Sequence, residues 1–440
     1  MNPLKTLFIL SAICLPALSV AQNKPDTIRL HSLPEVLSQA VKNNPTQAVY
    51  QQQLKQAALN YKASKGFIYP NASAGFTSTD NLHLSVTPVP GILIGQPGTT
   101  FYAQFGKKYN YSTGITLSQS IVDWTAVMQA KIAANNIRLS EAQRESFVQD
   151  LKEQVSRLYF SALVAKNALK INAVDKNLAD SIVALTRQRL KEGTTDLLSV
   201  NQATINSNNI LQNAAQSQQL YDQSVENLKI LLGEKPVNEL ELVEGLNVDT
   251  LTTSLPGDVG ADKSLLPYQQ QALVSELQSR SQRAAAYPKL SATMYLGGQQ
   301  FRDDFGLSLD NNRWNAYRYI GVNLTVPIFT GFTNANKYKS ALVQHDIANL
   351  QYQNARQQSE INDKLLLKNY ADYLQALKAS KNSFKLYGDN LRLNQQKYQE
   401  GVINMDTYLR AFQDYLNAEN LYLNNLSQLL SVRATLISRQ

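Results

Sequence analysis

The sequence predicts a mainly α-helical protein with a small β part, in which long antiparallel coiled-coil hairpins accompany four membrane β-strands per chain. Two long stretches lack proline and place apolar residues at alternating steps of three and four. Four short segments instead alternate apolar and polar residues, which is the period of a β-strand. The chain also repeats its own plan once, so both kinds of element occur in two sets.

Residues 1–21 are expected to be a secretory signal peptide. A lysine precedes the apolar run Leu7–Leu18, and Ser19-Val20-Ala21 gives the small-x-small ending before a cleavage site. A lipoprotein signal with Cys14 as acceptor is the alternative. The bulky Ile13 before Cys14 and the apolar run beyond it argue against that alternative. Because Cys14 is the only cysteine, no disulfide is expected in the mature chain.

Charge and composition exclude several classes of function. The formal net charge of +8 is spread without a basic cluster, so no nucleic-acid partner is expected. After the signal, no run of apolar residues is long enough to predict a membrane-spanning helix. Three scattered histidines, with no phosphate loop or nucleophile elbow, indicate that the protein is not an enzyme and needs no cofactor or metal. Asp303-Asp304 could bind calcium, but a solvated loop pair is the preferred interpretation because no spaced oxygen ligands follow.

An internal duplication defines the predicted domains. Residues 22–233 form the first copy, 234–263 a linker or equatorial segment, and 264–440 the second copy. Each copy is expected to run helix, strand, loop, strand, very long helix, tight turn and shorter helix. The segment 79–110, rich in Pro, Gly and Thr, is expected to be a long loop.

Three sequence pairs support this duplication. "VYQQQLKQAALNYKASKGFIYP" from residue 49 recurs as "PYQQQALVSELQSRSQRAAAYP" from residue 267. "STGITLSQSIVDW" from residue 112 matches "YIGVNLTVPIFTG" from residue 319. "RLKEGTTDLLSV" from residue 189 matches "KYQEGVINMDTY" from residue 397.

The four strands are expected at about 70–79, 110–121, 288–297 and 318–329. The last is the clearest, because Ile320, Val322, Leu324, Val326 and Ile328 alternate with polar or small residues. Ten tilted residues span about 23 Å, which matches the roughly 25 Å apolar band of an outer-membrane barrel. A water-soluble sandwich is the alternative. Flanking aromatics are expected in interface girdles: Tyr109, Tyr111, Trp314, Tyr317 and Tyr319 at one end, and Trp124, Phe329 and Phe332 at the other.

Four strands are too few to close a membrane barrel, so several chains are expected to share one. Two chains would supply eight strands and three would supply twelve. The residues alone do not choose between these numbers.

The helical hairpins are expected at about 123–233 and 331–438. Their first helices carry apolar positions at steps of four and three, which predicts coiled-coil packing. In the first hairpin these positions are Leu151, Val155, Leu158, Ala162, Ala165 and Leu169. In the second they are Leu366, Tyr370, Tyr373, Leu377, Phe384, Tyr387 and Leu391, and the pattern is broken only by Ser380.

Both ends of each hairpin have local signals. At the strand-to-helix corners, Asp123 and Thr330 can accept hydrogen bonds from the first helical amides, and Pro327 is expected near a strand end. At the tips, Gly193 and Gly401 fit the left-handed residue that ends a helix.

Polar residues that follow these glycines can begin the returning helices, with Asp196 and Asn404 as N-caps. The tips are the candidate docking surface, with Gly193, Thr194, Asp196, Gly401, Val402 and Asn404 as its residues.

With these residues placed, the chain resembles the TolC family of outer-membrane efflux channels. The resemblance covers essentially the whole mature sequence. It is carried by the order and duplication of loose motifs, such as the corner "LTVPIFTGF" and the turn "YQEGVINMDTYLRA". It implies a homotrimer with a twelve-stranded barrel in outer-membrane lipid and a helical tunnel in the periplasm of a Gram-negative bacterium.

The resemblance also implies a function. The tunnel would give passive exit to substrates of a tripartite efflux pump or a type I secretion system. Its tips would dock on a periplasmic adaptor (membrane fusion) protein joined to an inner-membrane pump of RND or ABC type. A soluble periplasmic coiled-coil adaptor or scaffold is the alternative, although such a protein normally has one hairpin and no barrel strands.

The resemblance further names gate candidates. Tyr398 matches a family tyrosine that helps to tie the tip shut. Thr407, Arg410 and Ser199 match positions that are acidic in the family, so an acidic constriction is not expected at these positions.

Overall fold

The computed structural model of the chain describes residues 27–248 and 259–440. The predicted signal peptide and Cys14 lie outside the described residues, as does part of the predicted linker. The chain forms two compact units, which are taken in turn below. Of the described residues, the unit with the sheet comprises 41–154, 259–379 and 428–440, and the unit with the hairpin tips comprises 27–40, 155–248 and 380–427.

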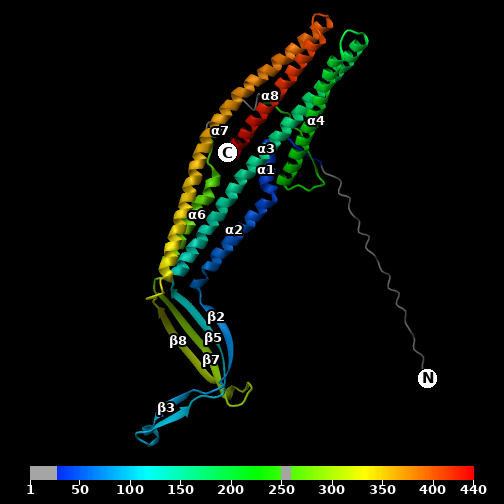
Figure 1. Ribbon diagram of the computed structural model, residues 1–440. Helices are drawn as coiled ribbons and strands as arrows, with labels where there is room; N and C mark the ends of the chain where they lie inside the picture. The colour runs from blue at the N-terminus through cyan, green and yellow to red at the C-terminus, as the bar shows by residue number, and fades with distance from the viewer. Residues whose placement is uncertain (1–26, 249–258) are drawn as a thin grey trace, which may run out of the picture. The chain divides into compact units, whose positions relative to one another are not determined.

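The unit with the sheet contains four antiparallel strands (Figure 1). Its strands lie in the order β2-β5-β7-β8. Their bounds are Asn71–Asp80 for β2, Tyr109–Val122 for β5, Lys289–Arg302 for β7 and Asn315–Thr325 for β8. Within this sheet β2 and β8 each pair on one side only, so both outer strands carry free backbone hydrogen-bonding groups.

The strand predicted at 318–329 is placed too far along the chain. It ends at Thr325, although the alternation of apolar residues continues to Ile328. Pro327 has no amide hydrogen to donate to a ladder, so it lies beyond the strand and not within it. Gly331 and Phe332 then adopt positive φ values of 57° and 62°, which turn the chain toward the next helix. The strand predicted at 288–297 is too short, since β7 continues to Arg302.

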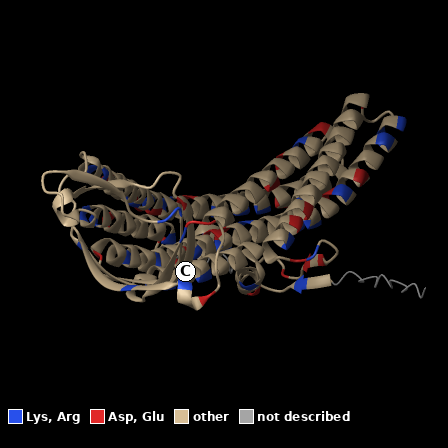
Figure 2. Cartoon of the chain, turned by 90° about the horizontal axis from the view of Figure 1, so that it is seen from below, with Lys and Arg blue, Asp and Glu red and all other residues tan. Residues whose placement is uncertain are grey.

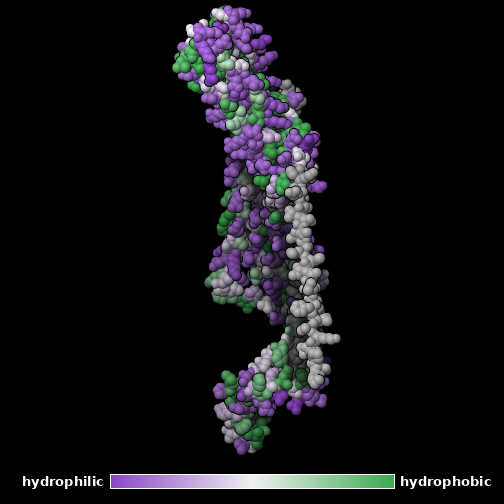
Figure 3. Space-filling view, turned by 90° about the vertical axis from the view of Figure 1, so that its right-hand side faces the viewer, coloured by the Kyte–Doolittle hydropathy of each residue, from purple (hydrophilic) through white to green (hydrophobic). Residues whose placement is uncertain are grey.

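The two faces of the sheet differ sharply in polarity. The register places Met294 opposite Ile320 on one face and Tyr295 opposite Tyr319 on the other. The first face is apolar, and hydrophobic side chains are visible at the lower end of Figure 3, over the sheet and its loops. Its apolar members are Ala72, Ala74, Phe76, Ile115, Leu117, Leu290, Ala292, Met294, Leu296, Ile320, Val322 and Leu324, and the register places the polar residues Thr113, Gln119 and Arg318 on the same face.

This register corrects the predicted aromatic girdle. Tyr317 and Tyr319 lie on the polar face with Tyr295, opposite the face that carries Ile320. The reason is the two-residue period of the strand, which sends odd-numbered residues of β8 away from the apolar side.

The segment 79–110 contains more structure than the loop that the sequence predicts. Strands β3 (Val86–Pro90) and β4 (Thr100–Gln104) pair as an antiparallel hairpin around the short helix η2 (Gly91–Ile94). Pro88 and Pro90 hide this hairpin in the sequence, because proline is tolerated only on edge strands such as these.

Long helices follow the sheet strands directly. Helix α3 is Trp124–Lys191 and α7 is Thr333–Gln399. The amides of Thr125 and Ala126 donate to Asp123 Oδ1 at 2.9 and 3.2 Å, so Asp123 caps α3. Thr330 accepts at its hydroxyl from the amide of Asn334 at 3.4 Å, a longer contact at the start of α7.

The remaining helices and short elements complete the two units. Helices α4 and α8 return from the tips, and α1, α2 and α6 precede the sheet strands (Figure 1). Helix α7 contains one interior glycine, Gly388. A Cβ added to Gly388 would lie 3.6 Å from the Tyr415 ring. The bounds are α1 Leu33–Asn43, α2 Pro45–Ser64, η1 Gly66–Ile68, α4 Leu197–Leu232, η3 Lys263–Leu265, α6 Leu266–Ala284, η4 Asn311–Arg313 and α8 Met405–Ser438.

The predicted linker also carries a strand. Strand β6 (Glu239–Leu242) pairs in parallel with β1 (Thr27–Leu30), and Leu30 and Leu242 are fully buried. Four residues are too few for an alternating pattern to be recognised in the sequence.

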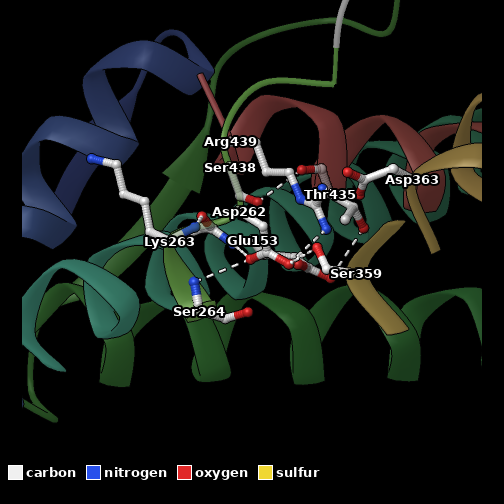
Figure 4. Close-up of polar contacts among 10 residues, drawn as sticks. Glu153, Asp262, Lys263, Ser264, Ser359, Asp363, Thr435, Ser438 and Arg439 are labelled. Carbon is white, nitrogen blue, oxygen red and sulfur yellow. Dashed lines mark hydrogen bonds and ion pairs between the residues drawn. The ribbon is translucent and has the colours of Figure 1, made fainter. Parts of the chain in front are cut away.

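A buried polar cluster joins helices of the sheet-containing unit (Figure 4). Arg439 pairs with Asp262 at 3.3 Å and with Asp363, and its side chain is 8% exposed. Asp262 also accepts from Ser359 at 2.6 Å and from Gln149 at 3.1 Å. The cluster therefore connects the last residues after α8 to α3, to α7 and to the segment before α6.

Charged residues of both signs occur along the helices, as the coloured positions in Figure 2 show. None of the helices in residues 27–248 and 259–440 is long and apolar enough to cross a bilayer.

Candidate functional site at the hairpin tips

The first hairpin turns at Gly193, which has a φ of 70°. The amides of Gly193 and Thr194 donate to the carbonyls of Leu190 and Arg189 at 3.1 and 2.9 Å, so the last carbonyls of α3 are satisfied. Asp196 then accepts from the amide of Ser199 at 2.8 Å and caps α4. That hydrogen bond lowers the pKa of Asp196.

The second hairpin repeats this geometry. Gly401 has a φ of 78°, and the amides of Gly401 and Val402 donate to the carbonyls of Tyr398 and Lys397 at 3.1 and 2.9 Å. The amide and the hydroxyl of Thr407 donate to Asn404 Oδ1 at 2.9 and 2.7 Å. Glycine is needed at both turns because other residues reach positive φ only at a cost in free energy.

An aromatic stack lies directly behind the second turn. The rings of Tyr398 and Tyr408 are 5.5 Å apart and nearly parallel. The guanidinium of Arg189, at the end of α3, lies 5.8 Å from the Tyr398 ring. Burial raises the pKa of Tyr398, with Glu192 adding to the rise and Arg189 opposing it. Burial also raises the pKa of Tyr408 to about 12, so both phenols are neutral at physiological pH.

A cavity of about 510 Å³ lies between the two turns. It is open to solvent and lined mainly by polar groups. Its lining residues are Arg189, Gly193, Thr194, Thr195, Asp196, Ser199, Tyr398, Gly401, Ile403, Asn404, Met405 and Asp406.

The structure brings some of the predicted gate residues together and separates others. Tyr398 and Ser199 both line this cavity. Thr407 is engaged in the cap of α8, and Arg410 pairs with Asp406 on an exposed surface where its side chain is 76% exposed. Thr407 and Arg410 are therefore not part of the cavity lining. The gating roles of all four residues remain predictions.

Farther from the tips, two buried carboxyl groups meet between α3 and α8. Asp175 is 2% exposed and Glu419 is 4% exposed, and the two side chains are hydrogen-bonded. The hydroxyl of Tyr415 donates to Asp175 Oδ1 at 3.1 Å. Burial, reinforced by the hydrogen bond and repulsion from Asp175, raises the pKa of Glu419 to about 9. Burial also raises the pKa of Asp175, while hydrogen bonds from Glu419 and Tyr415 oppose the rise.

Glu419 also borders a cavity of about 240 Å³ whose other described lining residues are uncharged. Because ionising both buried acids is unfavourable, the raised pKa of Glu419 predicts that the pair keeps a proton at neutral pH.

The positions of Asp175 and Glu419 in the sequence match the spacing of the buried residues on their helices, a feature that the expected apolar stripes do not include. Buried residues of α3 follow steps of three and four that include Asp175, and those of α8 follow steps that include Glu419. These residues are Ala168, Asn172, Asp175, Ala179, Ile182 and Thr186 on α3, and Met405, Tyr408, Phe412, Leu416, Glu419, Tyr422 and Leu426 on α8. An acidic residue at a core position of each helix is the sequence feature that indicates this pair.

Comparison with known proteins gives a family match. The family of outer membrane efflux proteins matches residues 36–234 and 263–438. A search of curated protein sequences gives no match.

Solved outer membrane proteins share this fold. The Campylobacter jejuni CmeC outer membrane channel superposes with a TM-score of 0.73 at 18% identity, over 92% of this chain and 85% of that one. The Neisseria gonorrhoeae MtrE outer membrane channel, in its open state, superposes with a TM-score of 0.75 at 17% identity, over 92% of this chain and 88% of that one. The outer membrane protein VceC from Vibrio cholerae superposes with a TM-score of 0.74 at 16% identity, over 92% of this chain and 95% of that one. At these identities the likeness concerns the fold.

Proposed function

Because the chain belongs to the outer membrane efflux protein family, we propose that three copies form one channel across the outer membrane and into the periplasm. Each copy contributes four strands to a twelve-stranded barrel and two hairpins to a periplasmic tunnel. The tunnel gives substrates a passive exit, and the energy comes from a partner pump.

The free edges of the sheet are the observation that carries this proposal. Strands β2 and β8 are unpaired on their outer sides, and neighbouring strands in the order β2-β5-β7-β8 run antiparallel. Strand β8 of one copy therefore runs opposite to β2 of the next, so copies can close a ring without breaking the antiparallel pattern. A closed ring removes both edges, as hydrocarbon requires.

The polarity of the sheet supports the same arrangement. Ile320 and Val322, on the apolar face, are 76% and 67% exposed in a single copy. Lipid would cover this face, and the polar face would surround a water-filled pore. The two faces thus match the two solvents of a membrane barrel.

The hairpin tips are the proposed docking site for a periplasmic adaptor protein. Both turns present exposed polar backbone and capped helix ends around one cavity. The adaptor would connect the channel to an inner-membrane pump of RND or ABC type or to a type I secretion system. Tyr398, with its ring stacked on Tyr408, would hold the tunnel entrance closed at rest.

Cell fractionation followed by native mass spectrometry in detergent tests the assembly. The proposal predicts recovery from the outer membrane as a trimer that conducts ions in planar bilayers. Recovery as a soluble periplasmic monomer would support the adaptor or scaffold alternative instead. Crosslinking at the tips, with Val402→Cys carrying a photoreactive group, should capture an adaptor, and the same probe on the exposed Leu350 of α7 is the matched control.

A further inference from the structure

Three tyrosine rings gather on the polar face of the sheet. Tyr295 of β7 pairs directly with Tyr319 of β8, and their rings are stacked at 5.7 Å. Tyr317 lies two residues earlier on the same face, 5.7 Å from Tyr295 and 5.5 Å from Tyr319. Tyr317 and Tyr319 remain 47% and 45% exposed. We refer to these three residues as the tyrosine platform.

Glycines fix the position of this platform. Gly114 of β5 is paired with Gly297 of β7, and the Tyr295 ring lies over both. A Cβ on Gly114 would lie 2.6 Å from the Tyr295 ring, and one on Gly297 would lie 2.7 Å from its hydroxyl oxygen. Backbone is also too close at both positions, because a Cβ on Gly297 would lie 2.4 Å from the Thr113 carbonyl oxygen and one on Gly114 would lie 2.8 Å from that of Leu296. Neither position can thus carry a side chain. The ring is therefore held flat on the sheet, as aromatic residues do over cross-strand glycines.

The surface beside the platform is bare. A Cβ added to Gly321 of β8 or to Gly75 of β2 would meet no atom within 4 Å. Gly321 is two residues beyond Tyr319 and faces the same side of the sheet. A ligand can thus approach the ring faces without meeting side chains at these positions.

The polar face carries one charged side chain among its described strand residues, Lys289 at the start of β7, which lies opposite Thr325 and pairs with Asp123 at 3.2 Å. The other side chains of this face are Ser, Thr, Asn, Gln, Tyr and Phe, with glycines between them. The residues are Asn71, Ser73, Thr77, Thr79, Asn110, Ser112, Thr116, Ser118, Ser120, Ser291, Thr293, Gln299, Phe301, Asn315, Asn323 and Thr325. Between Thr293 and Gln299 of β7, away from Lys289, the electron-rich ring faces are consequently the main electrostatic feature of this surface.

In residues 27–248 and 259–440, no lysine or arginine lies over these three rings. Among the described residues, cations lie over Tyr61, Tyr109 and Tyr398, which are occupied by Lys65, Lys108 and Arg189. The three rings of the platform have no such partner in that same part of the chain. The exposed parts of Tyr317 and Tyr319 are therefore open to a cation that comes from solution.

We propose that Tyr295, Tyr317 and Tyr319 form a binding site for organic cations, such as quaternary ammonium or planar cationic compounds, on the pore face of the barrel. The proposal rests on the proposed function in one respect, namely that the polar face lines a pore. Large organic cations lose their water more easily than inorganic cations, so ring faces can hold them without a carboxylate. Contacts of this kind are individually weak, which suits a site that cargo must also leave.

Isothermal titration calorimetry of the detergent-solubilised full-length protein with phenyltrimethylammonium tests the site. The double variant Tyr317→Leu with Tyr319→Leu should weaken binding about 5-fold or more, because leucine has no ring face. The double variant with phenylalanine at both positions should stay within about 2-fold of the unmodified protein, since the ring is kept. Asn323→Leu, on the same strand and face, is the matched control and should bind normally. Tyr295 is left in place because its ring packs on the sheet.

The neutral isostere tert-butylbenzene, measured by equilibrium dialysis, separates charge recognition from simple apolar contact. The leucine variant should lose much less affinity for it than for the cation. Equal losses for both compounds, or unchanged cation binding in the leucine variant, would overturn the proposed site.

Planar-bilayer recordings separate this proposal from the proposed function. In conducting channels, phenyltrimethylammonium should reduce the current, and the leucine variant should need a several-fold higher concentration. A trimeric channel whose block ignores the tyrosines overturns the site alone. A protein that forms no channel, yet binds the cation through the tyrosines, overturns the pore function and leaves the site standing.

Discussion

Asp175 of α3 and Glu419 of α8 are both more than nine-tenths buried and share a hydrogen bond that links helices of two different hairpins. This relationship ties the stability of the hairpin unit to pH. The sign follows from linkage: the pKa of Glu419 in the folded chain is about 9, against 4.5 in its ordinary state. Between pH 4.5 and about pH 9, the folded state therefore keeps a proton that the unfolded state has already released.

Stability should consequently fall as pH rises from 4.5 toward 9, with a slope of up to about 1.4 kcal/mol per pH unit from this group. Thermal unfolding followed by circular dichroism at several pH values measures the slope. Glu419→Gln removes the titrating group and should flatten it, while Glu226→Gln, at an exposed position, should not. A Glu419→Gln protein with the slope of the unmodified protein would show that the pair does not hold a proton.

Arg439 is expected to be the most sensitive residue of the buried polar cluster. Arg439→Met leaves Asp262 and Asp363 without their cation, which should cost about 3 to 5 kcal/mol of stability. Combining it with Asp262→Asn should recover part of that loss, because one buried charge then disappears. Arg356→Met breaks an exposed pair and should cost less than about 1 kcal/mol. Equal effects of Arg439→Met and Arg356→Met on the denaturation midpoint would contradict the role of the cluster.

Acid should weaken the same cluster through Asp262. Burial raises its pKa, but hydrogen bonds from Ser359, Ser264 and Gln149 and the charge of Arg439 outweigh burial, so the net pKa is lowered. A lowered pKa contributes stability above the ordinary value of 3.8, and this is lost as pH falls through the folded-state pKa. Asp262→Asn should therefore make unfolding less dependent on pH below about 4. An unchanged acid transition in that variant would place the titrating groups elsewhere.

The turns at the tips should respond to substitution in the same way in both hairpins. Gly193→Ala and Gly401→Ala force alanine into a positive φ and should each cost about 1 kcal/mol. Asn404→Ala removes the cap of α8 and should cost a similar amount, about 0.5 to 2 kcal/mol. Hydrogen exchange of the first turn of α8 measures the local effect. Unchanged protection in Asn404→Ala would mean that the cap does not hold that turn.

Tyr398 and Arg410 should differ in their effect on conductance. Tyr398→Ala removes the ring that stacks on Tyr408, and it should raise single-channel conductance in planar bilayers. Tyr398→Phe keeps the stack and should conduct like the unmodified channel. Arg410→Ala changes an exposed pair with Asp406 and should have the smaller effect. If Tyr398→Ala conducts normally, the constriction lies elsewhere.

Periodicity predicted the elements with long, regular patterns. The stripe from Leu151 to Leu169 and the alternation from Ile320 to Leu324 each extend over several repeats, so helix and strand were distinguishable. The end of the strand at Thr325 could not be predicted from periodicity, because the alternation continues to Ile328. The ladder stops earlier since Pro327 has no amide hydrogen to donate. The hairpin β3-β4 was hidden by its own prolines, and β6 was too short to show a period.

The candidate site was predictable only where local geometry determines it. Gly193, Asp196, Gly401 and Asn404 lie in turns whose residue preferences follow from backbone conformation. The proton shared by Asp175 and Glu419 depends on two residues far apart in the chain, and the tyrosine platform depends on strand register. Contacts between distant segments of this kind cannot be obtained from a local pattern.

Disulfide crosslinking between β2 and β8 of neighbouring copies tests the central claim most directly. Pairs of cysteines on the polar face, such as Ser73→Cys or Thr77→Cys combined with Asn323→Cys or Thr325→Cys, cover the unknown register between copies. Ala74→Cys with Asn323→Cys points to opposite faces and is the matched control. The account predicts that at least one polar-face pair gives covalent dimers and trimers and nothing larger. Monomers throughout the scan, or a ladder extending beyond three copies, would contradict a barrel shared by three chains.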